Sequence, residues 1–400
     1  MPEPVSDNLA SLKVKHLLSM SVGNEKEPTH VVIQQEHWVK AFLEQPITHE
    51  PGSVFMYNST ATYMLSAIVT KLTGQTVLDF LKPRLFEPLG ITGMTWETCP
   101  LGINTGGWGL SIPTEGLAKF GQLYLQKGRW NGEQILPAKW VREATSFKIQ
   151  QPLADKPGRP KEKNDWMQGY CYQFWRCQHD CFRGDGAFGQ YTIVLPKQNA
   201  VIVMTGESNN MQGELDLVWQ HLLPACQSKA LPAAESALPK TLKSLTLALP
   251  QGKPILATAS ELSAKTFKLE TNTLGIDSAN ITFKDSVCTF TATAGDTKHV
   301  INCGLGEWQR GETLMPGTPP RLIAGGAPRT PVPSKVASAA AWKDANTLEM
   351  LWRYYETPHH DTVTCKFNGD TITVSFLNSL ASMNGKTKDT RPDLIGKIEA

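Results

Sequence analysis

Apolar side chains recur at helical spacing in the stretch that follows Tyr57. They occupy the i, i+3, i+4 and i+7 positions of one helix face: Ala61, Met64, Leu65, Ile68, Val69 and Leu72. This spacing predicts a helix with one buried face. Ser59 suits the N-cap, because its hydroxyl can satisfy free amides of the first turn, and Gly74 suits the end of the helix. Tyr57 therefore lies just before a rigid element.

The same pattern predicts further elements on both sides of this helix. Helices are predicted at 12–20, 37–44, 76–86, 114–127, 137–146 and 213–223. Strand-like segments follow in close succession at 170–176, 184–195 and 200–205. Three consecutive strands with short connections favour an antiparallel meander. We therefore expect an α+β domain in which helices flank an antiparallel sheet.

The pattern changes again after residue 224. Residues 224–255 are rich in Ala, Leu, Pro, Ser and Lys and have no clear period, and the remainder is rich in predicted strands. Four hundred residues exceed one ordinary core. We predict a first domain at 1–225, a linker at 226–255 and an all-β antiparallel barrel or sandwich of roughly eight strands at 256–400. A Pro/Gly-rich loop is expected at 311–341.

Charge and composition exclude some functions. The formal net charge is +2, so nothing indicates a nucleic acid or an anionic membrane as partner. No apolar run approaches the ~20 residues of a membrane span. The first residues lack the basic and apolar regions of a signal peptide, so the compartment is cytoplasmic by default, and periplasmic or secreted if the true N-terminus lies upstream.

Cysteine usage does not indicate a disulfide scaffold or a metal site. Eight cysteines are spread over the chain, and we expect reduced, partly buried thiols. The segment Cys177-Gln178-His179-Asp180-Cys181 invites a metal-binding interpretation, but one such cluster is a weak signal for zinc. No metal and no cofactor are predicted.

Five short motifs together carry a resemblance to a known family. They are His-Leu-Leu-Ser-Met-Ser at 16–21, Pro-Gly-x-x-Phe-x-Tyr-Asn-Ser at 51–59, Phe-Glu-Pro-Leu-Gly-Ile at 86–91, Gly-Gly-Trp-Gly-Leu at 106–110 and Gly-Asp-Gly-Ala-Phe-Gly at 184–189. Roughly residues 8–225 resemble the serine β-lactamase-related family. That family includes class C β-lactamases, D-Ala-D-Ala carboxypeptidases and β-lactamase-like esterases. The resemblance implies a β-lactamase/transpeptidase-like fold, and the second domain is similar to the extra β-domain of some members.

The resemblance also implies roles for individual residues. Tyr57 would be the proton-shuttling phenol, because a phenol near a fixed cation can lose its proton early and act as a base. Ser59 would stand where the family usually has an amide that orients the substrate. The strand motif would supply the oxyanion hole, with the amide of Phe188 as donor. The expected substrate and oxyanion residues are Asn58, Trp108, Asp185, Gly186, Ala187 and Phe188.

Asp185 departs from the family pattern, which has a cation at that place. An anion there would repel the carboxylate of β-lactams and peptidoglycan stems, whereas a neutral ester need not carry one. We therefore expect a carboxylesterase that forms an acyl-enzyme and acts on a small-molecule ester or amide. β-Lactamase or D-Ala-D-Ala carboxypeptidase activity is the alternative.

The nucleophile motif of the family, Ser-x-x-Lys, does not occur in the chain. Three interpretations follow from its absence. The chain is a serine hydrolase whose nucleophile segment lies upstream, or it binds ligands without turnover, or it uses another nucleophile, for which Ser59 is the candidate. Without the leading segment, unpaired strand edges and apolar surface would be exposed, so self-association is expected.

Overall fold

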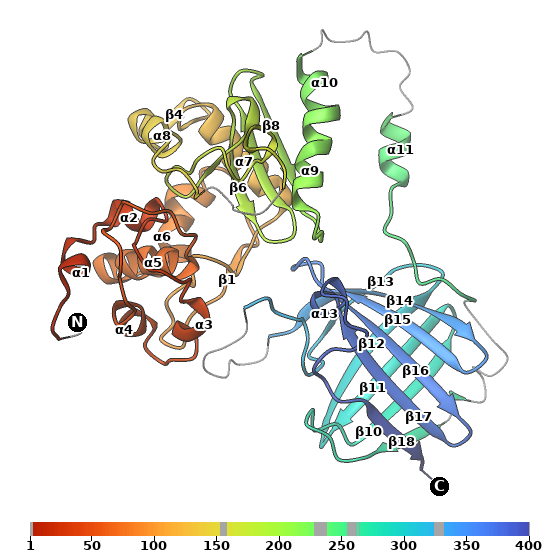
Figure 1. Ribbon diagram of the computed structural model, residues 1–400. Coiled ribbons are helices and arrows are strands. Elements are labelled where there is room, and N and C mark those ends of the chain that lie inside the picture. The colour runs from red at the N-terminus through yellow and green to blue at the C-terminus, as the bar shows by residue number, and fades with distance from the viewer. Residues whose placement is uncertain are drawn as a thin grey trace. The chain divides into compact units, whose positions relative to one another are not determined.

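The computed structural model describes residues 3–152, 158–227, 238–253, 262–263, 265–323 and 332–399. The chain forms two compact units (Figure 1), which are Met1–Lys229 with Ile323–Pro328 and Ala230–Leu322 with Arg329–Ala400. In the predicted linker, residues 228–237 and 254–255 lie outside the described residues, and its described part contains helix α11 (Leu238–Ser244).

A group of helices fills the first part of unit 1. These are α1 (Asp7–Ser11), α2 (Val14–Leu18), α3 (Thr29–Val32), α4 (Trp38–Leu43), α5 (Ser59–Thr73) and α6 (Val77–Leu81), followed by the π-helical turn η1 (Lys82–Phe86). Helix α5 is central, since α2, α3 and α4 all pack against it. Trp38 meets the ring of Tyr63 edge-on, with 5.2 Å between centroids. The predicted helix after Tyr57 is therefore the core element of this region.

Asn58 caps helix α5, one residue earlier than predicted. Its Oδ1 accepts from the N–H of Ala61 at 3.0 Å and from the hydroxyl of Thr60 at 2.7 Å, while Ser59 is the first helical residue. Asn and Ser are about equally favourable at the N-cap, so the predicted cap at Ser59 was wrong by one residue. Gly74 ends the helix with a φ of +69°, as its position predicted.

Four antiparallel strands form the sheet of unit 1, in the order β5-β6-β7-β8. They are β5 (Trp175–Arg176), β6 (Phe182–Gly186), β7 (Gln190–Leu195) and β8 (Ala200–Met204). The other elements between residues 95 and 227 are β1 (Thr95–Trp96), β2 (Leu110–Ser111), α7 (Thr114–Leu125), β3 (Arg129–Trp130), β4 (Glu133–Gln134), α8 (Ala138–Ala144), η2 (Lys161–Lys163), η3 (Gln178–Asp180), α9 (Met211–Leu217), η4 (Val218–Leu222) and α10 (Leu223–Gln227).

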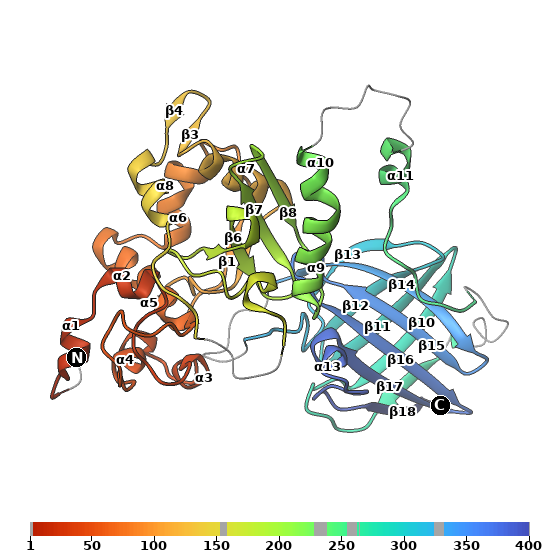
Figure 2. The same ribbon diagram turned by 45° about the horizontal axis from the view of Figure 1, so that its top comes forward.

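Helices cover both faces of this sheet (Figures 1 and 2). The alternation of strand side chains sends Tyr191, Ile193 and Leu195 into one cluster with Leu215 and the residues that follow it in η4 and α10. Helix α7 covers the opposite face, where Gly121 lies against β7 and β8. The predicted α+β architecture is confirmed. Strand β8 has no further strand beside it among the described residues, and self-association remains a prediction.

Two predicted strands were wrong in detail. The segment predicted at 170–176 forms a strand only at β5, with isolated bridges at Tyr170, and it is interrupted at Gln173, whose φ is left-handed at +60°. The segment predicted at 184–195 is a hairpin of β6 and β7, which turns at Phe188 (φ +67°) and Gly189 (φ +90°). A non-glycine residue with positive φ is uncommon, so the pattern did not signal either turn.

Unit 2 is a closed antiparallel barrel rather than a sandwich. Its strands are β9 (Thr266–Leu269), β10 (Ser278–Lys284), β11 (Val287–Ala294), β12 (Thr297–Leu305), β13 (Gln309–Thr313), β14 (Ser334–Asp344), β15 (Thr347–Arg353), β16 (His360–Asn368), β17 (Thr371–Asn378) and β18 (Leu394–Ile398), with helix α13 (Ser379–Met383) after β17. β18 pairs with β9, and a short parallel pairing of β12 with β14 closes the wall. In Figure 2 the strands on the near side of the barrel run across those on its far side.

Large apolar side chains fill the barrel. Alternate residues of the strands point inward, as period-2 burial requires: Phe290, Leu348, Met350, Trp352, Val363, Val374 and Phe376 are among them. Strand β14 was missed because its sequence, Ser-Lys-Val-Ala-Ser-Ala-Ala-Ala, consists mainly of Ser, Lys and Ala, which are not enriched in strands. None of the described helices combines the length and the apolar character that crossing a membrane requires.

We predict that Gly121→Ala destabilises unit 1. A Cβ at this position would lie 2.6 Å from Val201 Cγ1 and 2.8 Å from Thr192 Cγ2, and both side chains are stiff. The net loss in free energy of unfolding should be about 1 kcal/mol, because overpacking outweighs the helix propensity of alanine. Gly184→Ala is the control, since its nearest neighbour would be 3.8 Å away. Urea denaturation measures both, and equal midpoints would contradict the packing of α7 on the sheet.

Candidate functional site

Tyr57 lies at the end of the loop that enters α5, and its side chain remains 40% exposed. Its ring stacks on Trp175, with centroids 5.7 Å apart and an interplanar angle of 19°. Tyr170 contacts it edge-on at 6.4 Å. Because Trp175 pairs with Arg183 across β5 and β6, the phenol is fixed beside the strand that carries the second predicted motif.

Arg183 occupies the centre of this region and is fully buried. Its Nε donates to Asp185 Oδ2 at 2.8 Å, and its Nη1 donates to the sulfur of Cys177 at 3.2 Å. The guanidinium carbon lies 4.6 Å from the ring centre of Trp166 and 5.7 Å from that of Trp175. Contacts therefore lead from Tyr57 through Trp175 and Arg183 to Asp185, and the two predicted motifs meet in one site.

Asp165 supports Arg183 from behind. Its carbonyl accepts from Nη1 of Arg183 at 3.0 Å. Its fully buried carboxylate accepts from the backbone and side chain of Gln178 at 2.9 Å each, from Gln212 at 2.8 Å and from Trp219 at 2.9 Å. A buried carboxylate with four donors is well compensated. Asp165 therefore connects η3, α9, η4 and β6. Sequence reasoning did not identify it.

A second missed carboxylate, Glu27, lies beside Tyr57. It accepts from the backbone N–H of Ser59 at 3.1 Å and of Thr29 at 2.9 Å, so it anchors the first turn of α5. Burial, the negative charge of Asp185 and that of Glu27 raise the pKa of Tyr57 to about 12. The base role expected for Tyr57 requires a cation that lowers its pKa. The charged groups that shift the pKa are instead two carboxylates. At neutral pH the phenol keeps its proton and can donate it.

Asp185 is almost buried, with 7% of its side chain exposed. Burial raises its pKa, and the ion pair with Arg183 acts in the opposite direction. Its charge is therefore largely balanced within the site. The repulsion that the sequence predicted for a substrate carboxylate is correspondingly weaker.

The remaining residues of the Tyr57 motif differ in accessibility. Asn58 is fully buried, and its amide nitrogen donates to Asn24 Oδ1 at 3.1 Å while its oxygen caps α5. The side chain is thus committed to the fold. Ser59 is half-buried at the start of α5.

Trp108 packs into the helical core, with its ring centroid 5.7 Å from that of Trp38. The glycines before it have a steric reason. A Cβ on Gly107 would lie 2.5 Å from the carbonyl oxygen of Ser59, and one on Gly106 would lie 2.8 Å from that of Thr62. The Gly-Gly-Trp loop is therefore pressed against the first turns of α5.

The predicted oxyanion residues lie at the end of β6 and in the turn that follows it. β5 pairs only with residues 182 and 183, so Gly184, Asp185 and Gly186 have no strand beside their outer edge among the described strands. Ala187 is exposed and Phe188 lies in the hairpin turn, where its carbonyl accepts from the N–H of Ser208 at 3.1 Å. An open strand edge of this kind presents backbone donors to a bound ligand.

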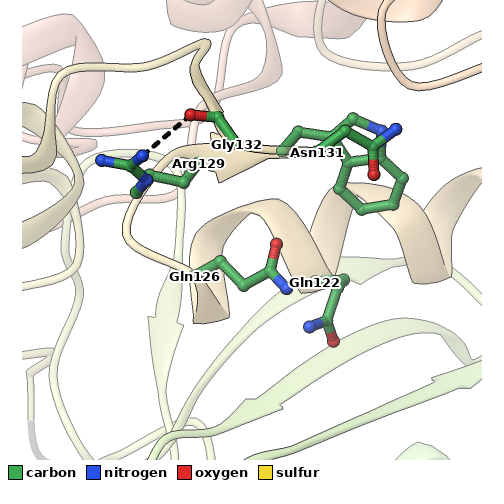
Figure 3. A pocket seen from close by; sticks show the side chains of 6 residues that line it. Gln122, Gln126, Arg129, Asn131 and Gly132 are labelled. Carbon is green, nitrogen blue, oxygen red and sulfur yellow. Dashed lines mark hydrogen bonds between the residues drawn. The ribbon is translucent and has the colours of Figure 1, made fainter.

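A separate polar hollow lies at the C-terminal end of α7 (Figure 3). It is lined by Gln122, Gln126, Arg129, Trp130, Asn131 and Gly132. The guanidinium of Arg129 donates to the carbonyl of Gly132 at 2.8 Å. None of the residues around Tyr57 lines this hollow. Within the described part of the chain, no three His, Cys, Asp or Glu side chains gather closely enough to hold a metal ion.

Comparison with known proteins agrees with these motifs. A family model described as Beta-lactamase matches residues 2–223, which is more than half of the chain. No curated protein matches the chain.

Several solved structures are similar to this chain. A protein from Bacillus anthracis assigned as a 6-aminohexanoate-dimer hydrolase is 22% identical, with a TM-score of 0.43 over 53% of this chain and 61% of that protein. A β-lactamase from Mycobacterium bovis is 18% identical, with a TM-score of 0.37 over 56% and 74%. An octameric penicillin-binding protein homologue from Pyrococcus abyssi is 13% identical, with a TM-score of 0.42 over 96% and 78%. The chain spans less than two thirds of the length of the first of these.

Tyr57 should remain a neutral phenol up to about pH 10. Its pKa is raised to about 12, above the ordinary value of ~10, so the native state holds the proton more tightly than the unfolded state. The stability that this contributes is fully present below pH 10 and is lost as pH rises from 10 to 12. Difference absorbance of the wild type against Tyr57→Phe should show no phenolate below pH 10. A Tyr57-dependent phenolate signal at pH 8–9 would contradict this electrostatic description.

Removing the charge of Arg183 should strongly destabilise unit 1. Arg183→Met leaves the buried Asp185 without its cation, which costs about 3–5 kcal/mol in free energy of unfolding. The double variant Arg183→Met/Asp185→Leu should recover part of this loss, because no unpaired charge remains. Urea denaturation of the wild type, both single variants and the double variant gives the coupling energy. Strictly additive losses would show that the ion pair does not matter.

Proposed function

This chain belongs to the β-lactamase family, and we propose that it is a serine hydrolase that acts on neutral carboxylic esters through an acyl-enzyme. The observation that carries the proposal is the contact between its two motifs. Tyr57 stacks on Trp175, which pairs with Arg183 on the strand of the Gly-Asp-Gly-Ala-Phe-Gly motif. A phenol and an open strand edge thereby border one site.

In this proposal Tyr57 acts as a general acid. The raised pKa keeps its hydroxyl protonated, so it can deliver a proton to the alkoxide that leaves when an ester is cleaved. The amide of Phe188, in the turn that follows β6, is the proposed donor to the oxyanion, with Gly186 and Ala187 leading into that turn. The nucleophilic hydroxyl is proposed to come from outside these 400 residues, because Ser-x-x-Lys does not occur in them.

The charge of the site supports an ester rather than a β-lactam or a peptidoglycan stem. Arg183 is the cation beside the strand motif, and it is bound to Asp185. A substrate carboxylate would have to compete with Asp185 for that guanidinium in a buried site, where an unpaired charge is costly. A neutral ester avoids this competition.

Ligand binding without turnover is the second candidate function. The absence of Ser-x-x-Lys from the chain favours it, and the neutral state of Tyr57 is compatible with a hydrogen bond to a bound carbonyl. In the third interpretation the nucleophile is Ser59, which is half-buried and follows Tyr57 by two residues.

A fluorophosphonate probe separates these candidates. We expect no labelling of Ser59 in the 400-residue chain, and labelling of a Ser-x-x-Lys serine in the longer product of the same locus. Tyr57→Phe should slow hydrolysis of an alkyl ester by that longer product about 10²- to 10⁴-fold, because the leaving alkoxide needs a proton. Ser59→Ala tests the other nucleophile, and Ser53→Ala, an exposed serine of the same loop, is the matched control.

Three outcomes contradict parts of the proposal. Labelling of the 400-residue chain that is lost in Ser59→Ala but kept in Ser53→Ala would assign the nucleophile to Ser59. Ligand binding by the longer product without any labelling would favour the non-catalytic function. Faster hydrolysis of benzylpenicillin than of p-nitrophenyl butyrate would show that the ester specificity is wrong.

A further inference from the structure

Two cysteines face each other across a tight loop next to Arg183. The loop joins β5 to β6, and the N–H of Cys177 donates to the carbonyl of Cys181 at 2.9 Å. Between them, His179 and Asp180 both have left-handed φ values, +61° and +56°. Both cysteines belong to the same buried cluster. The thiols are 4% and 2% exposed, while His179 and Asp180 at the tip of the loop are exposed.

The surroundings of the two sulfurs are unequal. Cys177 Sγ accepts from Nη1 of Arg183 at 3.2 Å, whereas the thiol of Cys181 donates to the carbonyl of Gln178 at 2.9 Å. Burial opposes a thiolate at Cys177, but the polar neighbour Cys181 and the charge of Arg183 lower its pKa overall. The nearness of Cys177 and burial raise the pKa of Cys181. A thiolate is the nucleophile in thiol chemistry, so the pair has one attacking sulfur and one resolving sulfur.

We propose that Cys177 and Cys181 are the site of a reversible disulfide. The sulfur of Cys177 attacks one sulfur of a low-molecular-weight disulfide, which breaks that S–S bond and releases one thiolate. Cys181 then gives up its proton and attacks the sulfur of Cys177 in the mixed disulfide, which releases the second small thiol. Two protein thiols are oxidised, and one external disulfide is reduced to two thiols.

Oxidation at this site would change the contacts of Arg183. A disulfide sulfur is a weaker acceptor than the free sulfur of Cys177 that faces Nη1, so the guanidinium would depend more on Asp185 and on the carbonyl of Asp165. Trp175 contacts both Arg183 and Tyr57, so a shift of the guanidinium would change the packing around the Trp175 ring. The inference rests on the two sulfurs and the guanidinium, and it holds whether or not Tyr57 takes part in hydrolysis.

The barrel contains a matched control pair. Cys288 and Cys303 are direct neighbours across β11 and β12 and are fully buried. Burial raises the pKa of both thiols, and no Lys or Arg contributes to those shifts. In both pairs the backbones of the two cysteines are adjacent, but no cation contributes to the pKa shifts of the barrel pair. We expect this pair to stay reduced under conditions that oxidise Cys177 and Cys181.

The test uses the full 400-residue chain with Cys226→Ser, which removes an exposed cysteine. The folded protein is equilibrated with reduced and oxidised glutathione in varied ratio, quenched with acid, alkylated and digested with trypsin. Cleavage after Arg176 and Arg183 leaves both cysteines in one peptide, so the disulfide appears as two missing alkyl groups. Cys181→Ser should stop at a mixed disulfide on Cys177.

The expected result is an oxidised fraction of the Cys177–Cys181 peptide that exceeds that of Cys288 and Cys303 by more than about tenfold at intermediate glutathione ratios. Dithiothreitol should restore full alkylation. Full alkylation of the peptide at excess oxidised glutathione would overturn the proposal. Oxidation of both cysteine pairs only at urea concentrations that unfold the protein would overturn it as well.

Discussion

The buried guanidinium of Arg183 is the interaction on which the first unit depends. A charge without solvent is tolerated only when it is paired and hydrogen-bonded. Asp185, the carbonyl of Asp165 and the sulfur of Cys177 meet this requirement, and aromatic rings enclose the group. These three partners belong to different segments. By binding all of them, Arg183 holds together the loop before β5, the connection from β5 to β6 and the end of β6.

The environment of Tyr57 gives the site a definite chemical bias. Burial and two carboxylates, Asp185 and Glu27, raise the pKa of the phenol, and only the charge of Asp185 is offset by a buried cation. Glu27 then has two effects, since its carboxylate also anchors the N-terminus of α5.

The elements with clear periodicity could be predicted from the sequence, and those determined by distant contacts could not. Helix α5 and the alternating strands of the barrel follow from spacing alone, and the sequence also pointed to the motif containing Tyr57, which contacts the β5–β6 strand pair. Glu27 and Arg183 lie far from Tyr57 in the chain, so nothing local distinguishes them from surface charges. Strand β14 has small residues that form a strand because the barrel buries them, and the cap at Asn58 competes with an equally suitable neighbour.

The closure of the barrel makes its wall uneven. β16 and β17 share eight residue pairs, whereas β12 meets β14 only at Gly304↔Ala339 and Leu305↔Ala340. Few shared hydrogen bonds mean a low free energy of local opening. The cylinder thus has a seam, along which the wall unrolls first under heat or strain, and amide hydrogens beside that seam exchange with solvent before those of the broad hairpins.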